Sequence, residues 1–365
     1  MGCLAQAAGV CLKAYNNLIM KQIVEPVARE LIERELTPER LIRRTNNADN
    51  ELYSFVGSEA PNLMREVGRL REWSFRTAGG GTGAEVDVDE LDLRPEGYKQ
   101  LIVWDPAARE ILGGYRYIHI DPSRSSLDNL STSHYFKFSE RFVADYVPQM
   151  IELGRSFVQP KYQITGRSGK GLYALDNLWD GLGALIVLNP HIRYFFGKVT
   201  MYNSYNVHAR NLLFYFFEKY FADKESLVVP MHPVQVDMDR QQMAQLFCGA
   251  SYKDDYRILG QEIKKYGERI PPLINSYMNL SPSMKVFGTC INSDFGQVEE
   301  TGILITIPDI YQDKIERHIK PFGLINRLRQ AKRLVKAKKA ATKPAEKTAK
   351  PRKSRRAKAK SEAND

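Results

Sequence analysis

Residues Ile151 to Val158 read Ile-Glu-Leu-Gly-Arg-Ser-Phe-Val, and this stretch decides the fold. Its apolar residues are set among polar ones and Pro160 ends the run, so the pattern predicts a β-strand. Successive side chains of a strand point to opposite faces, which places Arg155 on one face and Glu152 and Gly154 on the other. A glycine inside a strand often marks a bulge or the close approach of a ligand. The stretch therefore indicates either a structural Glu–Arg pair with a packing glycine or part of a binding site.

A loop rich in glycine and basic residues follows at residues 166–171, before a strongly apolar helical stretch from Leu172 to Leu188. The start of a helix offers unpaired N–H groups and the positive end of the helix dipole to an anion. The loop is either a simple turn or a site for the phosphate of a ligand. The residues that would hold this phosphate are Arg167, Gly169, Lys170 and Gly171.

Composition favours a large globular protein of the cytoplasm. With 365 residues, 43% of them hydrophobic, the chain can bury a sizeable core. Its longest apolar runs are too short to span a bilayer, and the first residues lack the basic start of a signal peptide. Its four cysteines are scattered without metal-ligand spacing, so we expect a reducing cytosol and no metal.

The positive charge of the chain belongs to its last residues. Residues 327–365 contain 16 Lys and Arg against 3 Asp and Glu, a net charge of +13, and because the whole chain carries +10 the remainder carries −3. Such blocks repel themselves and are expected to be disordered. Their usual partners are an anionic membrane face or nucleic acid, and the alternative is a solubilising tail without a specific partner. The tail has no aromatic residue, so base stacking is not available to it.

Glu85 to Asp92 form an acidic run whose crowded carboxylates repel one another. The run is either a site that recognises an amine or a set of structural partners for Arg71 or Arg76. A divalent metal is the weaker alternative, because the spacing of a calcium loop is absent.

The rest of the chain predicts helices and strands in alternation. Helices are expected at Glu25–Arg44 with a break at Pro38, Asn62–Arg76, Lys137–Tyr146, Asn206–Tyr220, Arg240–Phe247 and Asp255–Tyr266. Strands are expected at Glu51–Val56, Gln100–Trp104, Ile111–Ile120, Tyr194–Tyr202, Met284–Ile291 and Gly302–Ile307.

Several motifs occur in a specific order. They are Leu70-Arg71, Phe75, the glycines of residues 79–83, Asp87-x-Asp89-x-x-Asp92, Gly113-Gly114-Tyr115-Arg116 and Glu152-Leu153-Gly154-Arg155. Together they resemble the GNAT superfamily and, within it, the acyl-carrier-protein-dependent N-acyltransferases of ornithine-lipid and glycine-lipid synthesis, often labelled haemolysin-like. The glycine-lipid type is the most similar, through Tyr98–Trp104, Leu175–Leu182 and Glu299–Thr306. The resemblance covers roughly residues 36–320.

This resemblance implies an α/β fold with a GNAT-like mixed twisted sheet, flanking helices and extra helices after Asn206. We expect an N-terminal extension and helix at residues 1–35, the GNAT-like domain at residues 36–325 and the basic disordered tail at residues 326–365.

The resemblance also implies transfer of a fatty acyl or 3-hydroxyacyl group from acyl carrier protein to the α-amine of a small amino acid, with glycine favoured. Glu152 would be the general base or a scaffold, and a backbone N–H at Gly154 would stabilise the oxyanion. The substrate-binding residues would be Arg71, Asp87, Asp89, Asp92, Arg116 and Arg155. Asp87 stands where the related acyl-homoserine-lactone synthases have Glu, so the reach of that carboxylate differs.

The donor should need no cofactor, because a thioester is already activated. Residues 167–171 are one residue short of the usual GNAT phosphate signature, Gln/Arg-x-x-Gly-x-Gly/Ala. That departure fits a carrier-protein donor, which has one phosphate, better than coenzyme A. The product would be a membrane lipid or its precursor, and the tail would hold the enzyme peripherally on the inner membrane face.

Two other functions stay open on the sequence. One is a nucleic-acid-binding protein that acts through its basic tail. The other is a non-catalytic regulator that binds acyl carrier protein, although Glu152 and Arg155 are intact.

Overall fold

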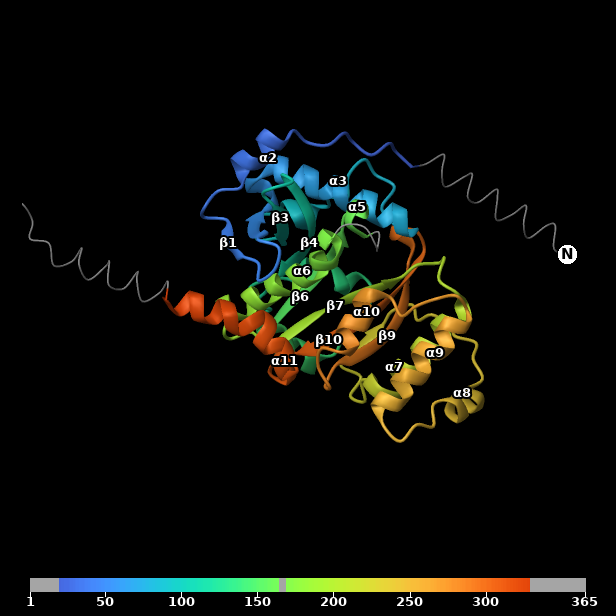
Figure 1. The fold of residues 1–365 in the computed structure, drawn as a ribbon. Coiled ribbons are helices and arrows are strands. Elements are labelled where there is room, and N and C mark those ends of the chain that lie inside the picture. The colour runs from blue at the N-terminus through green and yellow to red at the C-terminus, as the bar shows by residue number, and fades with distance from the viewer. Residues whose placement is uncertain (1–19, 164–168, 329–365) are drawn as a thin grey trace, which may run out of the picture. The chain divides into compact units, whose positions relative to one another are not determined.

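A large mixed sheet is the centre of the fold (Figure 1). The computed structural model describes residues 20–163 and 169–328, and the fold belongs to the compact unit that ends at Gly323. The strand order is β1-β2-β3-β4-β6-β7-β10-β9. Their bounds are Leu41–Arg44 (β1), Glu51–Val56 (β2), Lys99–Asp105 (β3), Glu110–Ile118 (β4), Met150–Val158 (β6), Tyr194–Met201 (β7), Lys285–Asn292 (β9) and Val298–Thr306 (β10). A small second sheet pairs β5 (Phe136–Phe138) with β8 (Val228–Pro230).

Helices cover both faces of the sheet. On one face lie α2 (Arg29–Glu35) and α3 (Pro61–Ala78). The other face is packed by α6 (Gly169–Leu188), α7 (Val207–Phe221), α9 (Tyr252–Lys265) and α10 (Pro272–Met278). Short helices are α4 (Glu90–Leu93), α5 (Pro160–Gln163), α8 (Arg240–Leu246) and α11 (Gln312–Lys314). The expected α/β fold with extra helices after Asn206 is confirmed.

The alternation of side chains along β3 explains the two layers. Leu101 and Val103 join the core on the α6 face, whereas Ile102 and Trp104 join the core on the α3 face. All four are buried, so this part of the sheet is covered on both sides. A ligand therefore needs a break in the sheet or an edge to reach its backbone.

Two expected helices are only partly correct. In residues 25–44 the helix is confined to Arg29–Glu35, and Leu41–Arg44 form β1 because they pair with β2. In residues 137–146 the chain forms β5, which pairs with the distant β8, and then a π-helical turn at Phe142–Tyr146. In both cases pairing with another part of the chain overrides local propensity.

The strands β6 and β7 run parallel, whereas the other neighbours in the large sheet run antiparallel. A parallel pair needs a crossover, and α5 with α6 provides it. The pairing runs from Met150 with Tyr194 to Leu153 with Gly197 and ends there. Both strands continue beyond this point, so they part within the sheet.

Gly197 allows the close approach of β7 to β6 at the last pair. A Cβ atom at this position would lie 2.5 Å from the carbonyl oxygen of Leu153, which forces the strands to shift. We expect Gly197→Ala to lower the free energy of unfolding by about 1–3 kcal/mol, the usual cost of overpacking. Urea denaturation followed by circular dichroism measures the change.

The matched control is Gly260→Ala in α9, where an added Cβ would meet no atom within 4 Å. Alanine is the better helix former, so this variant should gain about 0.5–1 kcal/mol. If both variants were equally stable, the close approach at Gly197 would not constrain the sheet.

Candidate functional site

A β-bulge lies where β6 leaves β7. The register between β4 and β6 shifts between Gly114 and Arg116, so Arg155 and Ser156 both lie opposite Tyr115. Arg155 has a φ of +49°, which is uncommon for a residue with a side chain and costs about 1–3 kcal/mol. Bulges bend the strand that carries them. The bulge thus accounts for the parting of the two strands.

Gly154 directly precedes the bulge. It pairs with Arg116 of β4, and an extension of the β6–β7 register by one residue would set it opposite Lys198. A Cβ at Gly154 would contact Arg116 Nε at 3.4 Å, an ordinary van der Waals distance. Packing in the free protein therefore does not demand a glycine here, and the bulge lies one residue later than the glycine suggested.

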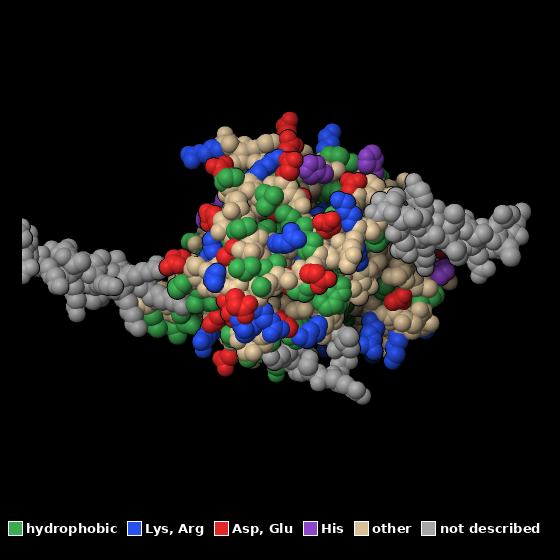
Figure 2. Space-filling view, turned by 90° about the horizontal axis from the view of Figure 1, so that it is seen from above, with side chains coloured by type: hydrophobic (Ala, Val, Ile, Leu, Met, Phe, Trp, Pro, Cys, Tyr) green, Lys and Arg blue, Asp and Glu red, His purple; other side chains and the backbone are tan. Residues whose placement is uncertain are grey.

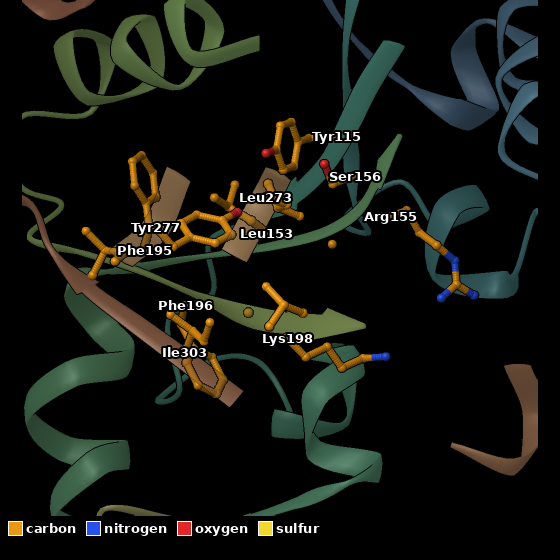
Figure 3. Close-up of a pocket in the computed structure, with 14 residues that line it drawn as sticks. Tyr115, Leu153, Arg155, Ser156, Phe195, Phe196, Lys198, Leu273, Tyr277 and Ile303 are labelled. Carbon is orange, nitrogen blue, oxygen red and sulfur yellow. The ribbon is translucent and has the colours of Figure 1, made fainter. Parts of the chain in front are cut away.

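A cavity of about 40 Å³ lies between the parted strands (Figure 3). That is room for only a few water molecules. Its lining residues come from β4, β6, β7, β10 and α10, with Leu153, Phe195, Val199, Leu273, Ile303 and Ile305 among the apolar ones. Tyr115, Ser156 and Tyr277 add hydroxyl groups. Burial raises the pKa of Tyr115 and of Tyr277, so both hydroxyls stay protonated at neutral pH.

The other end of the cavity is charged. Figure 3 shows Arg155 and Lys198 extending to the same side, away from Phe195 and Tyr277. Lys198 forms an ion pair with Glu300 of β10, and its Nζ lies 4.6 Å from the ring centre of Tyr135. Burial lowers the pKa of Lys198, and Glu300 opposes this shift. Neither Lys198 nor Glu300 was predicted as a site residue.

Arg155 is held from two sides. Its Nε donates to Asp87 Oδ1 at 3.1 Å, and its guanidinium lies 4.8 Å from the ring centre of Phe295. Asp87 is buried, and this burial raises its pKa although Arg155 and Arg71 act against the shift.

Two further arginines share one carboxylate. Arg71 Nη1 and Arg116 Nη1 donate to Asp92 Oδ2 at 3.1 and 3.2 Å, and Arg116 Nη1 also reaches Asp89 Oδ2 at 2.7 Å. Gln100 Nε2 donates to the other oxygen of Asp92 at 2.9 Å. Burial by itself raises the pKa of Asp92, but Arg71 and Arg116 outweigh it and hold this pKa below its usual value.

The six predicted substrate-binding residues thus lie in one ion-pair network. Asp89 and Asp92 are fixed by a reciprocal capping box at the start of α4. Arg155 lines the cavity, whereas Arg71 and Asp92 are fully buried. Arg116 and Asp89 connect Arg155 to the buried Asp92. Arg116 pairs with both Asp92 and Asp89, and Arg155 Nη2 lies 3.9 Å from Asp89 Oδ2. Direct contact of the six with substrate remains a prediction.

Glu152 is fully buried and satisfied by neutral donors. Its carboxylate accepts from the Tyr98 hydroxyl at 2.5 Å, the Ser131 hydroxyl at 2.8 Å, and the hydroxyl and backbone N–H of Thr132 at 2.5 and 3.3 Å. The Tyr98 ring in turn lies 4.3 Å from the guanidinium of Arg116. Among the described residues, those that line the cavity do not include Glu152. Its role as base or scaffold stays a prediction, and this geometry favours a scaffold.

The predicted phosphate site is described only in part. Arg167 lies outside the described residues. Gly169, Lys170 and Gly171 form the first turn of α6 rather than a loop, and the side chain of Lys170 is not described. The helix start follows β6 through α5, which is the order that the sequence predicted.

The surface of the body mixes both signs of charge. Figure 2 shows Lys and Arg interspersed with Asp and Glu on the face that it views. Within residues 20–163 and 169–328, no helix has the length and apolar character to cross a membrane, and no three His, Cys, Asp or Glu side chains gather as metal ligands.

Comparison with known proteins identifies one domain family and two similar proteins. The model of the acetyltransferase (GNAT) domain matches residues 70–172. A glycine N(alpha)-acyltransferase of Bacteroides thetaiotaomicron is 53% identical over 308 residues, which cover 83% of this chain and 91% of the relative. A glycine N(alpha)-acyltransferase of Phocaeicola vulgatus is 50% identical over 306 residues, which cover 83% and 94%. No solved structure matches significantly.

Asp92 is the anion on which two buried arginines depend, so its removal leaves buried charge without a partner. We expect Asp92→Asn to lower the free energy of unfolding at pH 7 by about 3–5 kcal/mol. The depressed pKa of Asp92 means that its stabilisation is present above the unfolded value of about 3.9 and is lost as pH falls through the folded value. The gap between variant and wild type should therefore narrow below about pH 4, in urea titrations run across pH.

Glu90→Gln is the control, since Glu90 lies in the same short helix and pairs with Arg94 in solvent. Its effect should stay within about 0.5 kcal/mol. An Asp92→Asn variant as stable as the control would contradict the dependence of the arginines on this carboxylate.

Proposed function

The chain belongs to the GNAT-type N-acyltransferases that include its two relatives, and we propose that it transfers a fatty acyl or 3-hydroxyacyl group from acyl carrier protein to the α-amine of glycine. The relatives' acceptor supports glycine. The observation that carries the mechanism is the parting of β6 and β7 beyond Leu153 and Gly197, beside a charged cavity mouth.

The parted strands suit an extended thioester arm. Beyond Leu153 the backbone of β6 faces the gap instead of β7, so its amide groups are available to an arm that enters between the strands. In this proposal the acyl chain runs toward the apolar residues around Phe195 and Leu273, and the thioester carbonyl lies near Gly154. A backbone N–H at the bulge would then stabilise the oxyanion.

The ion-pair network serves positioning. Arg155 reaches the cavity, and its strained backbone is held by Asp87 while Asp89, Arg116, Asp92 and Arg71 fix the surroundings. Aligned reactants gain roughly 7–11 kcal/mol over reactants free in solution. We assign Glu152 to the same task, because its hydrogen bonds hold Tyr98 against Arg116.

Three parts of the proposal are supported by the sequence alone. They are carrier protein as the donor, a cytoplasmic location and a role in membrane-lipid synthesis. The shortened phosphate signature at residues 167–171 supports a donor with one phosphate. We further propose that the basic tail holds the enzyme on an anionic membrane face. The thioester supplies the activation, so no cofactor enters the reaction as proposed.

The purified full chain, incubated with 3-hydroxyacyl or acyl carrier protein and a panel of amino acids, should form N-acylglycine, detected by mass spectrometry. Coenzyme A thioesters of the same chains are the donor control and should react at least about tenfold less well, since a missing protein interface costs more than 1.4 kcal/mol. Absence of any N-acylated amino acid with either donor would refute acyl transfer. Equal use of both donors would refute only the choice of carrier protein.

Glu152→Gln separates a base from a scaffold. As a scaffold, Glu152 affects turnover through folding, so the loss of kcat should follow the loss of stability measured by urea denaturation. As a base, it would be worth about 10²–10⁴-fold in kcat with stability unchanged. Ser131→Ala removes one donor to the same carboxylate and is the matched control for a purely structural loss.

The tail is tested by deletion of residues 327–365. Binding to vesicles that contain anionic lipid should be lost, with acyl transfer in solution retained. Salt-sensitive DNA binding that disappears on deletion, together with an inactive body, would favour the nucleic-acid alternative. An inactive body that still binds carrier protein would favour the regulator.

A further inference from the structure

Resting on the proposed function, we infer that Lys198 and Glu300 form the acceptor site of the enzyme. Lys198 binds the carboxylate of the amino acid, and Glu300 binds its ammonium group and accepts the first proton.

Lys198 lies at the cavity where a nucleophile has to be, and Glu300 contacts it from the adjacent strand. Lys198 follows Gly197, the last residue of β7 that pairs with β6, and it would lie opposite Gly154 if the pairing went on. It lines the cavity at its charged end, beside Arg155 (Figure 3). Glu300 pairs with Thr200 on the adjacent strand and directs its carboxylate to Lys198. An amine held here is next to the point where the strands begin to part.

The pair is almost closed off from water. The side chains of Lys198 and Glu300 are 10% and 3% exposed. Tyr135 covers the ammonium of Lys198 with its ring, and Asn292 Oδ1 accepts from the Tyr135 hydroxyl at 3.0 Å. The surroundings of the two charges are therefore fixed before any ligand arrives.

A zwitterion can replace both partners of such a pair at once. Breaking a buried ion pair leaves two uncompensated charges, which is unfavourable in a poorly solvated place. Glycine carries a carboxylate for Lys198 and an ammonium group for Glu300, both bonded to the same carbon, so the charges stay compensated when it enters. An amine without a carboxylate leaves Lys198 uncompensated.

Arg155 is less suited to this carboxylate. Its Nε already faces both oxygens of Asp87, at 3.1 and 2.8 Å, and its guanidinium is stacked on Phe295. Lys198, in contrast, makes its ion pair with Glu300, the residue that the ammonium group of the substrate would occupy.

The chemistry balances with the groups named. Glycine binds with three protons on nitrogen, and Glu300 accepts one of them and releases it to solvent once the product has left the site. The neutral amine attacks the thioester carbon, the C–N bond forms and the C–S bond breaks. One proton remains on the amide nitrogen, and the other goes to the leaving thiolate of the carrier protein.

The test compares glycine with glycinamide, which has the amine and lacks the carboxylate, as acceptors for the full chain with acyl carrier protein. Lys198→Gln should lose about 10- to 100-fold in kcat/KM for glycine, the worth of a hydrogen bond between charged groups, and change little for glycinamide. Glu300→Gln should lower kcat for both acceptors by about 10²-fold or more, because both present an amine.

Two further variants distinguish a loss of the acceptor site from a loss of folding. Lys198→Met combined with Glu300→Gln leaves no unpaired buried charge and should fold, yet should not prefer glycine over glycinamide. Glu299→Gln is the matched control, since Glu299 neighbours Glu300 on β10 but pairs with Arg210. It should keep the preference of the wild type for glycine, and any loss of rate should follow its loss of stability.

The outcomes separate the two proposals. A wild-type chain that acylates neither acceptor refutes the proposed function. A wild-type chain that acylates glycine, with the same fractional loss for glycine and glycinamide in Lys198→Gln, overturns the acceptor site alone. An unchanged kcat for Glu300→Gln removes Glu300 as the proton acceptor.

Discussion

The rest of the structure depends on one constraint, the ending of a parallel strand pair in the middle of a sheet. The β6 and β7 strands are hydrogen-bonded for four residue pairs and then part, at the bulge that Arg155 and Ser156 form against Tyr115. Because parallel neighbours need a crossover, the same arrangement places α6 over the sheet and keeps the gap from being an exposed edge. A break in such a position gives a ligand access to backbone groups that an intact sheet would use internally.

Holding that break open has an energetic cost, and a network of ion pairs fixes the geometry around it. Arg155 has a positive φ, and four of the five other charged groups in its network, Arg71, Asp87, Asp92 and Arg116, are buried. The three arginines and three aspartates balance in charge, and the network leaves each carboxylate beside a guanidinium. Buried pairs of this kind add little net stability compared with apolar packing, but they fix geometry. Their position beside the gap indicates that geometry is what they provide.

The sequence predicted the parts of this arrangement that are local. Gly154 and Arg155 are adjacent, the aspartates of the Asp87–Asp92 motif are close together in the chain, and these local patterns point to a bulge and to buried charge. It did not predict Lys198 and Glu300, because they come from strands far apart in the chain and only the fold brings them together. The same limit explains β1 and β5, whose strand pairing depends on β2 and β8 rather than on their own composition. For Glu152, the pattern identified a buried acid but not the four groups that donate hydrogen bonds to its carboxylate.

One end of the cavity is apolar and the other is charged, and the two ends lie on opposite faces of the sheet. Leu153, Phe195 and Val199 face the core that α6 shares, where an acyl chain gains by leaving water. Lys198 and Glu300 face the other side, where charges have to stay compensated at every moment. In the proposed reaction, a thioester that threads the gap would present its carbonyl between these faces, so the acyl chain and the zwitterion would not compete for the same surroundings. In the free protein the two charges at this end compensate each other, and under our proposal a substrate that carries the same two charges would enter without disturbing that balance.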